Sequence, residues 1–138
     1  MKKFLIFIIV LCSLKVFSQQ ESPNIRYDFK YVYYVITDRK SNKDNIIPTG
    51  TNCVVNYNKF YKKYFIGWTD QKGISAGTYF YYIPSKLEKE NVIMSKDDNG
   101  GKYVIQNTVN TKGIMTLTIL EPHSEEYSMK IVLANKEL

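Results

Sequence analysis

Residues 25–37 read IRYDFKYVYYVIT, a run dominated by Tyr, Val, Ile and Phe. In its first half the odd positions from Ile25 to Tyr31 are apolar or aromatic, and the even positions between them are charged. Successive side chains of a β-strand point to opposite faces, so this alternation predicts a strand with one buried face and one face in water. Aromatic and β-branched residues are also good strand formers. We therefore take this segment as the first strand of the domain.

Working outward from it toward the C-terminus, seven more segments have the composition of strands. They are residues 52–58, 62–69, 77–83, 92–96, 102–109, 114–120 and 127–134. Turn signals separate them. Gly73 ends the turn-forming run Asp70-Gln71-Lys72-Gly73, at a position where a positive φ is often required. Asn99-Gly100 is the pair that a type I′ hairpin turn favours. One turn of helix is expected at residues 84–88, because Ser85 and Glu88 have capping-box spacing.

About eight short strands without a long stripe of period 3.6 predict an all-β domain. An open sheet of that size would leave two unpaired edges and one apolar face in water, so the sheet is expected to close or to stack. The predicted architecture is a small up-and-down antiparallel barrel, and a two-sheet sandwich is the alternative. The order of the strands resembles that of small lipocalin-like barrels. The Gly-x-Trp mark of those barrels near the first strand is missing, because Gly67-Trp68 is adjacent and lies in mid-chain.

The first 20 residues, MKKFLIFIIVLCSLKVFSQQ, have the pattern of a secretory signal peptide. Lys2 and Lys3 precede an apolar run, and Val16 and Ser18 stand at the −3 and −1 positions of a cleavage site that makes Gln19 the new N-terminus. The apolar run is about 11 residues long, whereas a membrane-spanning helix needs about 20. We therefore expect cleavage after Ser18 and no stable membrane span afterwards.

Cleavage would leave residues 19–138 as a single all-β domain that is secreted or periplasmic. The leader holds three of the 19 basic residues and none of the 13 acidic ones, so the formal charge of the mature chain falls from +6 to about +3. Residues 58–65 (NKFYKKYF) interleave Lys with aromatic residues, as proteins that bind single-stranded nucleic acid do. Export and the modest charge argue against nucleic acid. A polysaccharide or an anionic cell surface is the better partner for this segment.

Groups that could carry catalysis or hold a metal are sparse. His123 is the single histidine, and Cys53 is the single cysteine of the predicted mature chain. Cys53 is in phase with Val55 and Tyr57, which predicts that it packs in the core. Metal sites usually need several converging ligands, and a catalytic thiol needs a base within hydrogen-bond reach. We expect no enzyme activity, no metal and no cofactor.

Two features point to a binding role. Residues 38–51 (DRKSNKDNIIPTGT) form a 14-residue connection without a clear pattern, a length at which loops are often functional. The apolar Ile46 and Ile47 within it either cap one end of the core or belong to a lid over the barrel mouth. Adjacent aromatic residues such as 79–82 (YFYY) place rings on both faces of a strand, so an outer aromatic surface could dock a partner or a sugar.

These features give six candidate ligand-binding residues: Tyr34, Ile46, Ile47, Trp68, Tyr79 and Tyr82. We predict an exported, non-enzymatic β-barrel protein that binds a small apolar ligand, a glycan or an envelope protein. The alternative is a structural or envelope-associated protein whose barrel is filled and holds no ligand.

Overall fold

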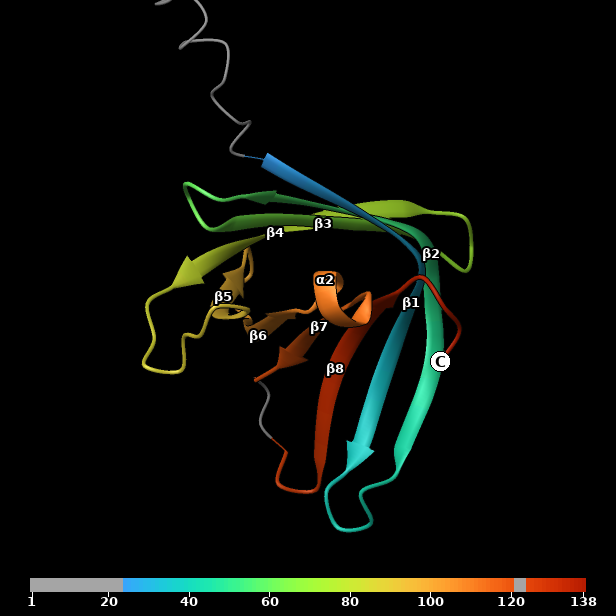
Figure 1. The fold of residues 1–138 in the computed structure, drawn as a ribbon. Helices are drawn as coiled ribbons and strands as arrows, with labels where there is room; N and C mark the ends of the chain where they lie inside the picture. The colour runs from blue at the N-terminus through green and yellow to red at the C-terminus, as the bar shows by residue number, and fades with distance from the viewer. Residues whose placement is uncertain (1–23, 121–123) are drawn as a thin grey trace, which may run out of the picture.

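The computed structural model describes residues 24–120 and 124–138 (Figure 1). These residues form eight antiparallel strands, each paired with its neighbours in sequence, and the last strand pairs with the first to close a barrel. The predicted up-and-down barrel is confirmed, and the two-sheet sandwich is excluded. The predicted signal peptide, its cleavage site at Ser18 and Gln19, and His123 lie outside the described residues.

The strands agree closely with the predicted segments except at the second one. They are β1 (Asn24–Asp38), β2 (Asp44–Asn58), β3 (Lys63–Asp70), β4 (Ser75–Ile83), β5 (Val92–Asp97), β6 (Lys102–Asn107), β7 (Ile114–Ile119) and β8 (Tyr127–Ala134). A four-residue helix, α2 (Val109–Lys112), stands between β6 and β7.

The barrel interior is filled by side chains. Cys53, Val55 and Ile66 are each no more than 1% exposed, and they belong to one cluster with nine further buried side chains. The predicted inward face of Cys53 and Val55 is thus confirmed. Burial raises the pKa of the Cys53 thiol to about 12, so the group is protonated at neutral pH and acts as a small apolar residue.

The prediction of a long loop at residues 38–51 is wrong. The turn that follows β1 is short: Asp38 accepts hydrogen bonds from the backbone N–H groups of Lys40 and Ser41, both at 2.8 Å. β2 then begins at Asp44. Ile46 and Ile47 are strand residues that pair with Val35 and Tyr34 of β1. They therefore do not belong to a lid.

Pro48 explains why the sequence misled us. Proline cannot donate a backbone hydrogen bond, so it argues against a central strand. Here residues 44–48 pair with β1 alone, because pairing with β3 starts only at Gly50. This part of β2 is an edge, where proline is tolerated. The register of β1 also shifts opposite Pro48, between Val32 and Tyr33.

Two smaller expectations about turns are also corrected. Residues 84–88 form a turn and no helix, closed by a 3.2 Å hydrogen bond from the Glu88 N–H to the Ser85 carbonyl. The turn between β5 and β6 has a positive φ at Gly100, 86°, but not at Asn99. A type I′ turn needs both residues at positive φ, so this hairpin uses a different turn.

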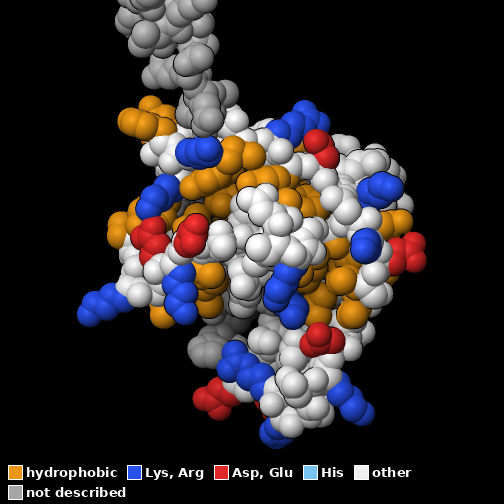
Figure 2. Space-filling view, in the orientation of Figure 1, with side chains coloured by type: hydrophobic (Ala, Val, Ile, Leu, Met, Phe, Trp, Pro, Cys, Tyr) orange, Lys and Arg blue, Asp and Glu red, His pale blue; other side chains and the backbone are white. Residues whose placement is uncertain are grey.

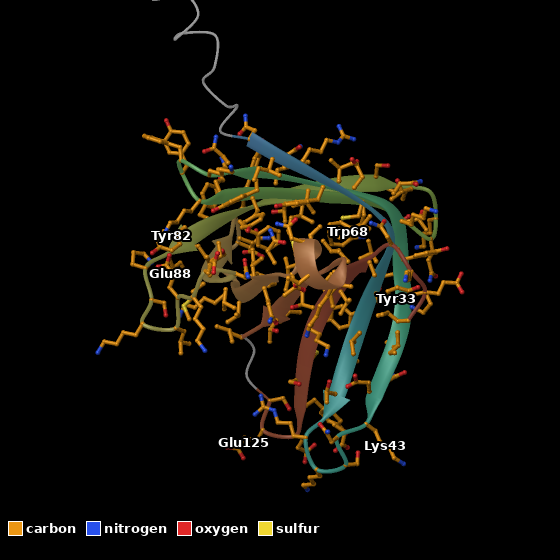
Figure 3. The ribbon with its side chains drawn as sticks, viewed as in Figure 1. Tyr33, Lys43, Trp68, Tyr82, Glu88 and Glu125 are labelled. Atoms are coloured by element: carbon orange, nitrogen blue, oxygen red, sulfur yellow. The ribbon has the colours of Figure 1, made fainter. Side chains whose placement is uncertain are left out.

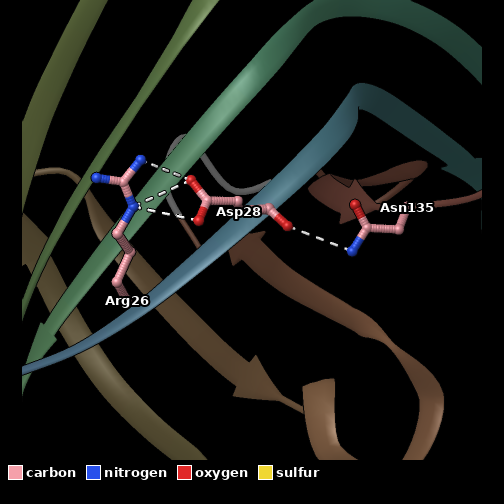
Figure 4. Close-up of polar contacts among 3 residues, drawn as sticks. All are labelled: Arg26, Asp28 and Asn135. Atoms are coloured by element: carbon pink, nitrogen blue, oxygen red, sulfur yellow. Dashed lines mark hydrogen bonds and ion pairs between the residues drawn. The ribbon is translucent and has the colours of Figure 1, made fainter.

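The C-terminus closes the barrel seam with a side chain. Beyond the end of β8, the Asn135 amide accepts a hydrogen bond from the Lys30 N–H at 3.0 Å and donates one to the Asp28 carbonyl at 3.3 Å (Figure 4). The ion pair of Arg26 with the Asp28 carboxylate, 2.8 Å, lies on the exposed surface and contributes little to stability. The side chain of Asn135 thus extends the β1–β8 ladder by one position.

Candidate functional site

A pocket of about 460 Å³ opens at the end of the barrel near α2. In Figure 1, α2 stands at the centre of the ring of strands. Three tyrosines line this mouth pocket: Tyr27 near the start of β1, Tyr57 near the end of β2 and Tyr64 near the start of β3. The other lining residues are Glu90, Asn91, Ile93, Asn107, Thr108, Asn110 and Thr111.

The polar side of the mouth pocket is held by the connections that follow β4 and β6. The Asn107 N–H donates a 2.8 Å hydrogen bond to the Asn91 carbonyl, which ties the two connections together. The chain then turns through α2 and stops at Gly113, whose φ is 68°, a left-handed conformation that glycine adopts without strain. The short helix brings Thr108 and Thr111 to the pocket wall.

One hydrogen bond crosses the opening. The Asn107 side-chain N–H donates to the Tyr27 hydroxyl at 3.3 Å, although β1 and β6 are not neighbours in the barrel. Asn107 also contacts the Tyr64 hydroxyl. The rings of Tyr57 and Tyr64 stack at 4.3 Å with 19° between their planes. These contacts hold three phenols and one amide in fixed positions around the opening.

Two of the phenols at the mouth, those of Tyr57 and Tyr64, are hydrogen-bonding groups and not bases. Burial raises the pKa of Tyr64 and of Tyr57 above the ordinary value, and for Tyr57 the nearby Lys62 opposes the rise. Both groups therefore keep their protons at neutral pH. Over residues 24–120 and 124–138, no group of three or more His, Cys, Asp or Glu side chains is placed to hold a metal ion.

The six residues singled out from the sequence do not gather at one site, although Tyr34 pairs with Ile47 next to Ile46 on β1 and β2. None of the six lines the mouth pocket. Trp68 is half-buried and packs against the core, as its position inside the barrel in Figure 3 illustrates. The Tyr34 hydroxyl donates to the Met129 sulfur at 3.6 Å. Ile46 and Ile47, each 41% exposed, are surface residues of β2.

Tyr82 belongs to a polar network beside the mouth. Its hydroxyl donates to the Glu88 carboxylate, which also pairs with the Lys62 ammonium at 2.5 Å. The Lys62 nitrogen lies 4.3 Å from the centre of the Tyr82 ring. Figure 3 shows Tyr82 and Glu88 together at one side of the barrel. These contacts fix the β4–β5 connection, so Tyr82 supports the structure around the mouth pocket.

Sequence reasoning missed the mouth tyrosines because it weighed the density of aromatic residues. The useful signal was position. Tyr27, Tyr57 and Tyr64 are in phase with inward residues of their strands and stand close to the strand ends. An inward ring with a polar tip near a strand end reaches the barrel opening, where its hydroxyl meets water.

A second hollow, of about 590 Å³, lies between the β1–β2 turn and the β7–β8 connection. Ile36, Tyr127 and Met129 give it a largely apolar wall, with Lys43 at its rim; Figure 3 shows Lys43 at the tip of the β1–β2 turn. It borders the region 38–51 that the sequence singled out, although neither Ile46 nor Ile47 lines it.

One face of the molecule carries charges of both signs. Figure 2 shows Lys and Arg side chains spread over the visible face, with Asp and Glu between them.

Comparison with protein-family models, with curated proteins and with solved structures finds no match to this chain. Among the residues that the structure describes, no helix has the length and apolar character needed to cross a membrane.

Proposed function

We propose that this chain is an exported, non-enzymatic binding protein that holds a small polar molecule in the mouth pocket. The observation that supports this function is the mouth pocket itself, a hollow of about 460 Å³ lined by three tyrosines and by amide and hydroxyl side chains. Pockets for small ligands in proteins commonly measure about 300–1,000 Å³ and occur in the mouths of β-barrels.

The lining favours a particular ligand chemistry. The Tyr27 hydroxyl accepts from Asn107, so its own proton is free to bond to a ligand. The Tyr57 hydroxyl makes no hydrogen bond with any described residue, and Glu90 is the one charged residue of the wall. A small uncharged or cationic molecule that carries hydroxyl or amide groups matches these donors and acceptors better than the apolar ligand expected from the sequence.

The side chains that line and border the mouth pocket favour binding without catalysis. The phenols of Tyr57 and Tyr64 are protonated at neutral pH. The Glu88 carboxylate, two residues before Glu90, is already engaged by Lys62 and Tyr82. General acid–base catalysis needs a group whose pKa lies near the working pH. Export remains part of the proposal and rests on the signal-peptide pattern of the first 20 residues.

The test is to look for a ligand and to locate it. Native mass spectrometry of the protein purified from its own secretion shows whether a small molecule is retained. NMR titration with a library of monosaccharides, polyols and small amides then shows whether amide signals of residues 90–91 and 107–111 shift. We expect Asn107→Ala to weaken binding about tenfold, because a hydrogen bond and the fixed position of Tyr27 are lost.

Asn99→Ala is the matched control, because Asn99 is exposed in the β5–β6 turn and does not line the mouth pocket. It should bind like the wild type. A protein that retains no small molecule and shows no shift around the mouth with any member of the library would exclude the proposed function. It would favour the alternative of a filled structural barrel.

A further inference from the structure

The outer face of β3 and β4 carries a row of aromatic rings. Phe65 pairs with Tyr79 across the two strands, with ring centres 5.1 Å apart and 57° between the planes. Tyr81 follows on β4, 6.4 Å from Tyr79 and tilted by 39°. We call Phe65, Tyr79 and Tyr81 the aromatic platform. Tyr79 is 42% exposed, so the rings offer a solvent-facing surface on a rigid sheet.

Two glycines let one of these rings lie against the sheet. A Cβ atom on Gly77 would stand 2.5 Å from Cζ and 2.9 Å from Cε2 of Phe65, and one on Gly67 would stand 3.4 Å from Cε1. The outer part of the Phe65 ring therefore lies over both glycines. An aromatic ring that covers strand glycines stabilises the sheet. It also leaves the other side of the ring turned away from the backbone.

A lysine stands among the rings without an acidic partner. The Lys63 nitrogen is 3.9 Å from the centre of the Tyr79 ring and 4.8 Å from that of Tyr81. It makes no ion pair with any carboxylate of the described residues. Cation–π contact holds the ammonium in place and leaves its N–H groups available to an anion.

Amide side chains border the platform. A hollow of about 590 Å³ over this face is lined by Asn56 and Asn58 together with Lys63, Phe65 and Tyr79. Asn58 is held by Asn24, to which its side-chain N–H donates at 2.9 Å. The Asn56 amide makes no hydrogen bond within the part of the chain that the structure describes. It is exposed and can donate and accept at once.

We propose that the aromatic platform, with Lys63 and Asn56, binds an acidic oligosaccharide. The electropositive C–H face of a sugar ring stacks on the electron-rich face of an aromatic ring, and successive rings here are spaced like successive sugar units. Asn56 is suited to neighbouring hydroxyl groups, and Lys63 to a carboxylate of the sugar.

The composition of the face argues for this occupant over others. The centre of a protein–protein interface is depleted of lysine, whereas Lys63 stands at the centre of this one. A lipid surface would need a contiguous apolar patch, whereas amides border these rings. The formal charge of the chain without the predicted leader, about +3, also favours an anionic partner over a cationic one. The site is separate from the mouth pocket and shares none of its lining residues.

The test measures binding of oligomers of galacturonic, glucuronic and mannuronic acid, and of their methyl esters, by affinity electrophoresis and calorimetry. We expect at least one acid series to bind, and its methyl ester to bind more weakly. Tyr79→Ala should weaken binding about tenfold, the loss expected for one stacked ring. Lys63→Gln should remove the preference for the acid over the ester.

Tyr127→Ala is the matched control, because Tyr127 is 43% exposed on β8 and does not border the platform hollow. It should bind like the wild type, and so should Asn107→Ala, which tests the mouth pocket alone. The proposal is overturned if no acidic oligosaccharide binds, or if Tyr79→Ala and Tyr127→Ala behave alike. Self-association that Tyr79→Ala abolishes would also overturn it, because a second copy of the chain would then be the occupant.

Discussion

Replacing Gly50 by alanine tests how closely β2 and β3 approach where the barrel bends. Gly50 is buried and pairs with Val32 of β1 and Asp70 of β3. A Cβ atom there would stand 2.6 Å from the Thr69 carbonyl oxygen and would collide with the indole of Trp68. The φ of Gly50 is not in the left-handed region. Any cost of the substitution therefore comes from packing and not from backbone conformation.

The two obstructing groups cannot both move aside. Trp68 packs against the core, and the Thr69 oxygen belongs to the backbone where β3 pairs with Thr51 of β2. Inserting a methyl group into such a site costs about 1–3 kcal/mol, occasionally more. We place Gly50→Ala near 3 kcal/mol, because one of the obstructing atoms is backbone. For a domain of this size that loss lowers Tm by about 10 °C.

Urea and thermal unfolding, monitored by circular dichroism, give the free energy of unfolding of the wild type and of the variant. Trp68 is the one tryptophan of the sequence, so its emission should move to longer wavelength if the indole is displaced into water. Gly101→Ala is the control, because the three atoms nearest to its Cβ would be side-chain atoms, two of the Asp97 carboxylate at 3.1 and 3.3 Å and one of the Tyr103 ring at 3.3 Å, and none is a backbone atom. Equal losses for the two variants, with unchanged Trp68 emission, would refute the argument.

Three further predictions concern other parts of the molecule. Because burial raises the folded pKa of Cys53 from 9.0 to about 12, its contribution to stability is complete well below pH 9 and falls by about 1.4 kcal/mol per pH unit once the pH is above 10. Unfolding at pH 10 and 11 should show this slope in the wild type and not in Cys53→Ala. Contacts to Lys62 and Tyr82 lower the pKa of Glu88, so the support it gives is present at neutral pH and is lost as the pH falls through that lowered pKa. Hydrogen-exchange protection at residues 88–89 should therefore drop in Glu88→Gln at pH 7, and the wild type should match the variant in strong acid. Gly77→Ala should displace the Phe65 ring, cost about 1–3 kcal/mol and weaken binding of the acidic oligosaccharide; unaltered binding would show that the position of Phe65 is not used.

The strands could be predicted because their signal is local. Alternation in residues 25–31 and in residues 53–57 reflects one buried face, and that pattern survives wherever the strand finds its partners. Gly73, with φ of 81°, sits at the turn where glycine was expected. Polar residues and glycines between apolar runs were enough to predict the bounds of seven of the eight strands closely.

The first half of β2 escaped prediction because its stability is not local. Residues 44–48 contain Pro48 and exposed isoleucines, a composition typical of a loop. They become a strand because β1 offers a ladder along their whole length, and because no strand on the other side needs the N–H that Pro48 lacks. Pairing with a long neighbour overrides weak local preference.

The sequence indicates one of the two proposed binding surfaces but not the other. The sequence alone indicated lysines interleaved with aromatic rings in residues 58–65 and a cluster of aromatics at residues 79–82, and with them the outer face on which Tyr79 lies. It could not indicate the mouth pocket, because Tyr27 and Asn107 are 80 residues apart and meet only when β8 closes on β1. The alternation of buried and exposed side chains along a strand can be recognised from neighbouring residues in the sequence. A barrel opening, in contrast, forms only after every strand has paired with its neighbours.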